Sequence, residues 1–317
     1  MRNRVTPGEA RAPNKIWWDI GVVALLIAFI VSTFMLSAPV ARAESPWVTH
    51  QFPQDKEKWW WDADWWEHGR MPEPATHRTA SRSATYQSGD VEVPVTITSP
   101  QGTGNFPVVV FMHGRRGIDE LTRLVPQRIA ARGFVVVTPD FFSGRFIAPF
   151  PVAHEYAIED DAARAIDFAL KLPEARAQQK TCVVSHTRGG YYALKALVTK
   201  ARQDRIACYV SYYPHWQDPN AAEPAQVYQF ASEIGALVVP VLVFVGEHEQ
   251  YQRVRPILAG IDALTENKRD ARVIVYPGVG RGFDFRGRNV RTLADDIATQ
   301  DSLVRSAAFI RRHLGQR

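Results

Sequence analysis

From residue 85 to the end of the chain, short apolar runs alternate with segments whose apolar residues recur at helical spacing. The apolar runs cover residues 86–88, 91–97, 107–112, 134–138, 181–184, 206–212, 239–245 and 272–276. The helical segments cover residues 121–131, 156–172, 191–200, 252–265 and 293–314. Strands that alternate with helices form a mostly parallel sheet with helices on both faces. The first two runs are expected to form a hairpin across Gly89 and Asp90. The pattern therefore predicts one α/β domain over residues 85–317.

The N-terminal 43 residues have the layout of an export segment. Four basic residues, at positions 2, 4, 11 and 15, precede an apolar run over residues 20–40, and small residues follow it. This order is typical of a secretory signal, and the run is also long enough for a membrane-spanning helix. We expect residues 1–43 to be a signal peptide or a membrane anchor, with any membrane association through residues 16–40. Both alternatives place the body outside the cytoplasm, either periplasmic, secreted or membrane-anchored.

Much of the net positive charge of the chain lies in this export segment. Residues 1–43 hold five Lys or Arg against two acids, and so account for three of the five net positive charges. The rest of the chain shows no basic stripe with interleaved aromatic residues, which nucleic-acid-binding proteins typically carry. We therefore expect a small-molecule substrate or ligand and no nucleic acid.

Residues 44–84 form a tryptophan-rich arm. They contain six of the nine tryptophans, at positions 47, 59, 60, 61, 65 and 66. Because Trp contributes mainly through buried area, we expect these rings to pack against the domain. The alternative is a lid over a site, or a contact with a partner or a membrane surface, since apolar patches mark such contacts.

Cys182 and Cys208 are the only cysteines, and each lies in an apolar run expected to be a buried strand. An oxidising compartment permits a bridge between them. Residues that face each other on neighbouring strands rarely meet disulfide geometry. Two buried free thiols are therefore the favoured expectation.

Four strand ends carry sequences that suggest a site, because ligands of parallel sheets bind beyond the carboxyl ends of the strands. Residues 112–117 read MHGRRG, residues 185–190 read SHTRGG, residues 246–249 read GEHE and residues 276–283 read YPGVGRGF. In order and spacing, these blocks resemble the dienelactone hydrolase family over residues 91–314. The resemblance implies an α/β-hydrolase fold and hydrolysis of an ester or a lactone by a nucleophile at a strand-to-helix elbow.

The resemblance also locates the catalytic triad, whose positions are altered here. Members of the family read Gly-x-Cys-x-Gly-Gly, or its serine equivalent, at the nucleophile, Gly-x-x-Asp at the acid and Tyr-Pro-Gly-x-x-His-Gly-Phe at the base. In this chain Thr187 takes the nucleophile position, Glu249 the acid position and Arg281 the histidine position. Arginine stays protonated in proteins and cannot act as a base, so a triad of the familiar kind is not workable.

Two structural expectations follow from these substitutions. Thr187 is expected at the sharp turn of the elbow, where a β-branched residue with a positive φ is strained. The base and the acid of the family converge, so we expect Arg281 and Glu249 to form an ion pair beside Thr187, because a buried carboxylate needs a partner.

Another histidine is a candidate for the missing base. His113 opens the loop of the first block, where a structural hydrogen bond is the alternative. His186 precedes the elbow, but neighbours on a strand point to opposite faces. His215 follows a strand end and is expected to overhang the site, and His248 precedes Glu249. His113, His215, His248 and Glu249 are the candidate metal ligands, but their spacing matches no zinc motif, so we expect no metal and no cofactor.

Other parts of the hydrolase machinery are present in the sequence. The backbone N–H groups of Arg188 and of the Gly114–Arg115 region are candidates for an oxyanion hole. Arg115, Arg116, Arg188 and Arg281 are expected around one pocket, with Arg116 and His215 as substrate-binding residues. Since guanidinium groups pair with carboxylates, the expected substrate or ligand is anionic, and the resemblance implies the same.

Three functions remain open at this point. The first is an exported hydrolase that acts on an anionic ester or lactone. The second is a catalytically inactive hydrolase-fold protein that binds a carboxylate ligand or a partner. The third is an interaction module built on the arm over residues 44–84. The resemblance favours the first, whereas the residues at the triad positions favour the second and predict weak or absent ester hydrolysis.

Overall fold

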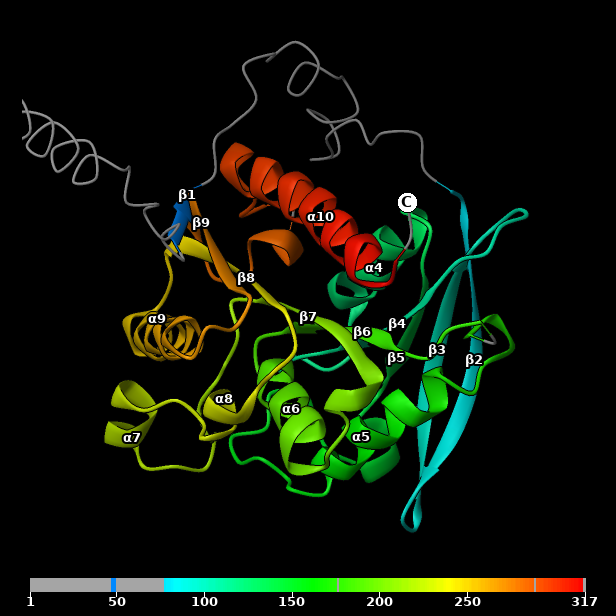
Figure 1. Ribbon diagram of the computed structural model, residues 1–317, viewed down its shortest axis with the longest axis horizontal. Coiled ribbons are helices and arrows are strands. Elements are labelled where there is room, and N and C mark those ends of the chain that lie inside the picture. The colour runs from blue at the N-terminus through cyan, green and yellow to red at the C-terminus, as the bar shows by residue number, and fades with distance from the viewer. Residues whose placement is uncertain (1–46, 50–76, 176, 288, 316–317) are drawn as a thin grey trace, which may run out of the picture. The chain divides into compact units, whose positions relative to one another are not determined.

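The computed structural model describes residues 47–49, 77–175, 177–287 and 289–315. A nine-stranded sheet runs through the domain in the order β1-β9-β8-β7-β6-β4-β5-β3-β2 (Figure 1). The strands are β1 (Trp47–Thr49), β2 (Thr79–Ser88), β3 (Val91–Pro100), β4 (Val108–Met112), β5 (Val135–Pro139), β6 (Thr181–His186), β7 (Ile206–Tyr212), β8 (Val241–His248) and β9 (Ala271–Gly280). The pairs from β1 to β5 are parallel, whereas β3 and β2 add an antiparallel hairpin at the other edge.

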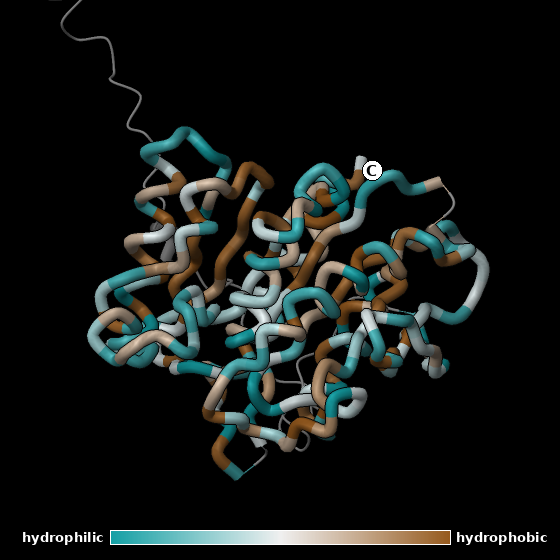
Figure 2. Tube along the Cα trace, turned by 90° about the horizontal axis from the view of Figure 1, so that it is seen from below, coloured by the Kyte–Doolittle hydropathy of each residue, from teal (hydrophilic) through white to brown (hydrophobic). Residues whose placement is uncertain are grey.

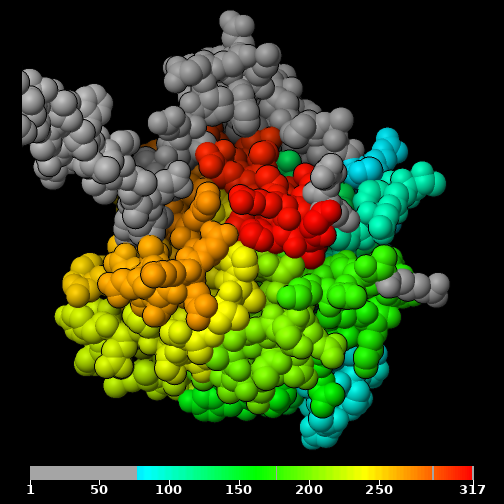
Figure 3. Space-filling model, viewed as in Figure 1, coloured from blue at the N-terminus to red at the C-terminus, as the bar shows by residue number. Residues whose placement is uncertain are grey.

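Helices cover both faces of the sheet. One face packs against α5 (Ile158–Ala169), α6 (Gly189–Leu194), α8 (Glu233–Ala236) and α9 (Tyr251–Glu266). The other face packs against α4 (Glu120–Ala131) and α10 (Leu293–His313). The short α7 (Glu223–Tyr228) contacts α9. Figure 3 shows that α10, in red, is exposed on the surface of the molecule.

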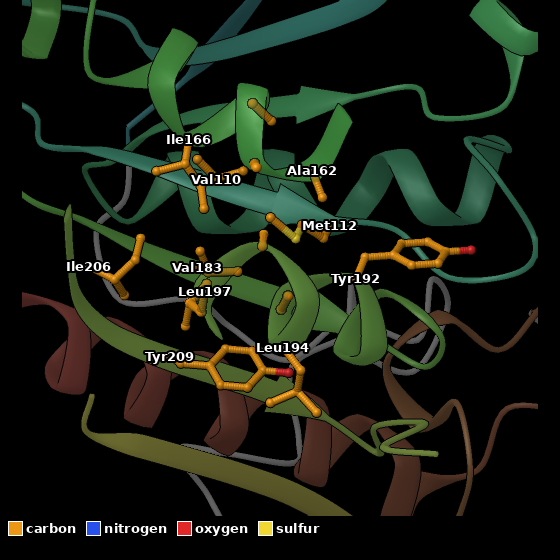
Figure 4. Close-up of a cluster of buried hydrophobic side chains, with 14 of the residues drawn as sticks. Val110, Met112, Ala162, Ile166, Val183, Tyr192, Leu194, Leu197, Ile206 and Tyr209 are labelled. Carbon is orange, nitrogen blue, oxygen red and sulfur yellow. The ribbon is translucent and has the colours of Figure 1, made fainter. Parts of the chain in front are cut away.

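The two cores follow from the period-2 alternation of side chains along buried strands. On β4, Val110 and Met112 face the α5 and α6 layer, whereas Val109 and Phe111 face the α4 and α10 layer. Figure 4 shows Val110 and Met112 in a cluster with side chains of the neighbouring strands and helices. Along the trace, apolar and hydrophilic residues alternate in short stretches, and hydrophilic residues lie on many of the outer turns (Figure 2).

This architecture confirms the predicted α/β-hydrolase fold. Two boundaries differ from the expectation. Strand β2 begins at Thr79, so residues 79–84 belong to the sheet rather than to the arm, and Trp47 to Thr49 pair with β9 as β1. Residues 1–46 and 50–76 lie outside the described residues, and with them the expectations for the export segment and for most of the tryptophan-rich arm. Within the described ranges, no helix combines the length and apolarity that a membrane span requires.

The expectation of two free thiols was wrong, because Cys182 and Cys208 form a disulfide. They are direct partners on the parallel pair β6–β7, next to a shift in register between Thr181 and Cys182. Their Cα atoms are 4.7 Å apart, which lies inside the range of about 4.4–6.8 Å that disulfides accept. The spacing of neighbouring strands therefore permits this bridge, and both of its cysteines are fully buried.

Candidate active site at the strand-to-helix elbow

Thr187 forms the turn between β6 and α6, as predicted. Its φ is +47°, in the left-handed region, where a β-branched residue costs on the order of 1–3 kcal/mol. Its backbone is held on both sides: the N–H donates to the Tyr212 carbonyl at 3.2 Å, and the carbonyl accepts from the His215 N–H at 2.7 Å. These bonds fix the elbow against the end of β7, and the side chain remains partly exposed.

Two glycines allow the elbow to approach the end of β4. A Cβ on Gly114 would lie 1.7 Å from the Thr187 hydroxyl oxygen, and a Cβ on Gly189 would lie 2.3 Å from the Met112 carbonyl oxygen. The loop that contains Gly114 therefore lies directly against the Thr187 hydroxyl. Arg188 is the N-cap residue of α6, so its N–H has no acceptor within the helix. The structure thus brings Gly114 and Arg188, two of the expected oxyanion-hole residues, to Thr187.

The predicted ion pair between Arg281 and Glu249 is confirmed. Arg281 Nη1 lies 3.1 Å from Glu249 Oε1, with the Glu249 side chain fully buried and that of Arg281 19% exposed. Glu249 Oε1 also accepts from the Gln250 N–H at 2.8 Å. The Arg281 guanidinium lies over the Tyr213 ring, 5.5 Å from its centroid. A fixed cation therefore stands where a hydrolase would carry its proton acceptor.

His215 lies at the elbow, but its ring is already engaged. Arg253 Nη1 donates to His215 Nε2 at 2.6 Å, which requires that nitrogen to be unprotonated. Burial, followed by the positive charge of Arg253, holds the pKa of His215 well below its usual value. His215 is therefore neutral, and the lone pair that a base would use is occupied.

The other candidate bases are also placed away from the Thr187 hydroxyl. His113 Nε2 accepts from the Phe141 N–H at 3.1 Å, and its Nδ1 lies 2.8 Å from the Gly114 carbonyl, so its role is structural. The His248 side chain is exposed. In the described part of the chain, the Thr187 hydroxyl has no histidine partner.

His186 belongs to a buried cluster that the sequence did not indicate. Its Nε2 lies 3.2 Å from Asp284 Oδ2, and the Tyr213 hydroxyl donates to the other oxygen of Asp284. Burial lowers the pKa of His186 and outweighs the opposing effect of Asp284. The His186 ring packs against Phe111 and Tyr212 of the core on the α4 and α10 side, so it points away from the elbow.

Of the four arginines expected around one pocket, three lie within electrostatic reach of the elbow. Arg115 is exposed on the Gly114 loop, and the Arg281 guanidinium pairs with Glu249. The Arg188 side chain is buried and donates to the carbonyls of residues 151–153 at 3.1–3.2 Å. Arg116 differs, because Asp119 accepts from its guanidinium.

The structure adds Arg253, which sequence reasoning missed. Burial, followed by the charges of Arg281, Arg188 and Arg115, lowers the pKa of Arg253 to about 10. Arg253 lies in the first turn of α9, four residues after Glu249. That position after the acid is the one signal in the sequence, and it does not distinguish Arg253 from a solvated helix residue.

The arrangement supplies oxyanion-type donors and an excess of positive charge, but no general base. Four guanidinium groups, from Arg115, Arg188, Arg253 and Arg281, act electrostatically on His215, whereas one carboxylate, that of Glu249, pairs with Arg281 and acts on Arg253. Over the residues that the structure describes, no three His, Cys, Asp or Glu side chains converge as metal ligands would. The chemistry available is recognition of an anion, because guanidinium groups form charge-assisted hydrogen bonds with carboxylates and phosphates.

Comparisons with known proteins agree with this fold. The model of the dienelactone hydrolase family matches residues 93–314. A segment of 123 residues is 28% identical to chlorophyllase-1 of Citrus sinensis and spans 38% of this chain and 37% of that relative. The match thus covers little more than a third of the length of the curated relative.

Solved structures of esterases and hydrolases share the fold at low sequence identity. A putative dienelactone hydrolase from Klebsiella pneumoniae is 16% identical, with a TM-score of 0.58 over 74% of this chain and 99% of that one. A dienelactone hydrolase-like promiscuous phosphotriesterase from metagenomic libraries is 16% identical, with a TM-score of 0.55 over the same shares. A bacterial brefeldin A esterase is 20% identical, with a TM-score of 0.59 over 77% of this chain and 79% of that one.

Proposed function

The chain belongs to the dienelactone hydrolase family, and from that premise we propose that it binds a small carboxylate-bearing molecule at the elbow with little or no ester hydrolysis. The ligand is an acid, or an ester or lactone that carries a carboxylate. Arg115, Arg253 and Arg281 attract its charge, and Thr187 with the Arg188 and Gly114–Arg115 backbone contacts the group that a hydrolase would attack.

One observation carries this proposal: the ion pair between Arg281 and Glu249, with an N–O distance of 3.1 Å, at the place of the base and its acid. A threonine hydroxyl needs a base before it becomes nucleophilic. Arginine stays protonated in proteins and cannot act as that base. His215, the histidine of the elbow, already accepts from Arg253 at 2.6 Å. The arginine excess supports binding, and the absent base argues against turnover.

Calorimetric titration tests the binding proposal directly. Benzoate and butyrate are titrated into the full chain, with benzamide and butyramide as uncharged controls of the same shape. Because a hydrogen bond to a charged group contributes about 1.5–3 kcal/mol, each acid is expected to bind at least about tenfold more tightly than its amide. Equal affinity for acids and amides, or no binding of either acid, would reject the proposal.

A second function, ester hydrolysis through Thr187, is favoured by one specific observation. Thr187 keeps the left-handed backbone of an elbow, with φ at +47°, and its hydroxyl lies against Gly114. Under this alternative, an alkyl fluorophosphonate would form an adduct on Thr187, which peptide mass spectrometry detects. An adduct that Thr187→Ala abolishes would support hydrolysis, whereas an unlabelled Thr187 after long exposure would count against it.

We also propose that the body works outside the cytoplasm. The export layout of residues 1–43 and the disulfide between Cys182 and Cys208 both support this location, because disulfides persist in oxidising compartments. Cell fractionation with mass spectrometry of the N-terminus tests it, and a chain that lacks residues 1–43 is the control. Full-length protein recovered from the cytoplasm in soluble form would contradict the proposal.

A further inference from the structure

The guanidinium groups at the elbow differ in their hydrogen-bond and ion-pair partners. Arg188 is buried and donates to three backbone carbonyls, those of residues 151–153. Arg281 Nη1 forms an ion pair with Glu249 Oε1 at 3.1 Å. The partners of Arg253 are neutral: His215 Nε2 at 2.6 Å and Gln226 Oε1 at 3.4 Å. The exposed Arg115 has no side-chain partner in the described ranges.

Direct contacts hold these groups around one place. The His215 N–H donates to the Thr187 carbonyl at 2.7 Å, which ties the His215–Arg253 pair to the elbow. The Phe150 N–H donates to the Arg115 carbonyl at 2.7 Å, and the next three residues accept from Arg188. Arg115 and Arg188 are therefore both hydrogen-bonded to the same segment, residues 150–153. Arg281 stacks over Tyr213, two residues before His215.

The charge balance at this place is uneven. Glu249 compensates Arg281, so Arg115 and Arg253 are two partly accessible cations that form no ion pair within the described ranges. Burial, followed by the charges of Arg281, Arg188 and, more weakly, Arg115, lowers the pKa of Arg253, and Glu249 only partly opposes this shift. A ligand with one negative charge would pair with one of the two partly accessible cations. The other would remain without an anionic partner and would still be repelled by the neighbouring arginines.

We infer that the ligand of this site carries at least two negative charges, as a dicarboxylate or a carboxylate-bearing phosphomonoester does. This inference rests on the proposed anion-binding function and narrows its ligand class. The two anionic groups, or the two charges of one phosphate, pair with Arg115 and Arg253, while Arg281 remains with Glu249. His215 stays neutral and holds Arg253 through its Nε2.

Two matched pairs of probes test the charge requirement at pH 8 in low salt with the full chain. Methyl phosphate, a dianion at this pH, is compared with dimethyl phosphate, and succinate is compared with its monoamide. A second charge-assisted contact strengthens binding, so the dianion of at least one pair is expected to bind about tenfold or more tightly than its partner. A preference confined to one pair assigns a phosphate or a dicarboxylate, respectively.

Variants localise the preference to the elbow. Arg115→Gln removes an exposed side chain and should reduce the ratio of the two affinities to about one, and Arg253→Gln should do the same. Arg312→Gln, at the exposed C-terminal end of α10, removes the same charge elsewhere and should leave the ratio unchanged. Equal binding of dianion and monoanion in both pairs would overturn the inference and leave the proposed function standing. No binding of any probe would overturn both.

Discussion

An arginine in place of a histidine changes a proton acceptor into a fixed charge, and at position 281 the structure shows how that charge is accommodated. Among the described residues, Arg281 is the only cation that forms an ion pair with the fully buried Glu249. Removing one member of a buried pair typically costs about 3–5 kcal/mol, because the other charge is left uncompensated. The pair therefore has a structural role that is separate from catalysis.

Arg281→Ala should accordingly lower the free energy of unfolding by about 3 kcal/mol, measured by urea denaturation. Arg272 offers a matched control, because it pairs with Asp270 at 3.6 Å on the surface, with side chains 51% and 44% exposed. Arg272→Ala should cost less than about 1 kcal/mol. Equal losses for the two variants would show that burial of Glu249 does not depend on Arg281.

The double substitution Thr187→Ser with Arg281→His should restore ester hydrolysis. Serine relieves the crowding of a β-branched residue at φ +47°, and the histidine would stand beside Glu249 as a base beside its acid. General base catalysis contributes about 10²–10⁴-fold, so we expect at least a tenfold gain in the rate of p-nitrophenyl acetate hydrolysis. Arg281→His with Thr187→Ala is the control without a nucleophile. No difference between the two double variants, with both folded, would mean that the elbow no longer supports the chemistry.

At the residue scale, the sequence predicted the positions of the site residues that lie within the sequence blocks of the family. Thr187, Arg281 and Glu249 are where their blocks place them, because each block ends a strand of one parallel sheet. Arg253 was missed because an arginine in a helix has no pattern that separates a buried role from a solvated one. The partner of Arg116 is local: Asp119, three residues later, accepts from it, and this pairing was not considered.

At the scale of the elements, the bridge between β6 and β7 fastens the strand that carries the elbow to its neighbour. The two cysteines are separated by 26 positions, and closing a loop of that length stabilises a fold by about 3 kcal/mol in the chain-entropy model. The double variant Cys182→Ala with Cys208→Ala should lose about this much in urea denaturation.

Reductant alone offers a control for the bridge. Both cysteines are fully buried, so dithiothreitol should not reduce the bridge of the folded protein within minutes. Protein treated in this way without denaturant should therefore keep its unfolding midpoint. With denaturant present, reduction should shift the midpoint to that of the double variant. A double variant as stable as the wild type would show that the bridge does not contribute.

The long elements followed from local pattern, and the missed elements depended on distant partners. Buried strands such as β7 were predicted to the residue, because a continuous apolar run needs no other information. Strand β1 has only three residues and pairs with β9, more than 200 positions away. Helices α7 and α8 have six and four residues, too few for a helical period to appear.

At the scale of the whole molecule, buried histidines make stability depend on pH. Burial lowers the pKa values of His113, His186 and His215, so the folded state keeps them neutral, whereas the unfolded state protonates them below about pH 6.5. The stability from each is present above that pH and is lost as the pH falls, by about 1.4 kcal/mol per pH unit. Asp296 opposes this, because burial raises its pKa to about 6.

The free energy of unfolding should therefore fall by several kcal/mol between pH 7.5 and pH 5.5. Urea denaturation over this range measures the slope, and His215→Gln should reduce it by the share of one histidine. Because Arg253 donates to His215 Nε2, the amide oxygen of glutamine offers it an acceptor. A slope that is flat in the wild type, or unchanged in His215→Gln, would contradict the neutral assignment of His215.

The molecule as a whole keeps the fold of the dienelactone hydrolase family while its elbow combines Thr187 with an Arg281–Glu249 ion pair. A sheet of nine strands fixes where the loops at the strand ends meet, and the residues on those loops decide the chemistry. We propose that this elbow recognises an anion without activating Thr187 as a nucleophile.

The most direct test is the steady-state hydrolysis of p-nitrophenyl acetate by wild-type protein and by Thr187→Ala, with equal folding checked by circular dichroism. We expect the same rate for both proteins, close to the uncatalysed rate in buffer, because no base activates the threonine hydroxyl. A wild-type rate that Thr187→Ala lowers by about tenfold or more, the size of a lost catalytic group, would contradict it.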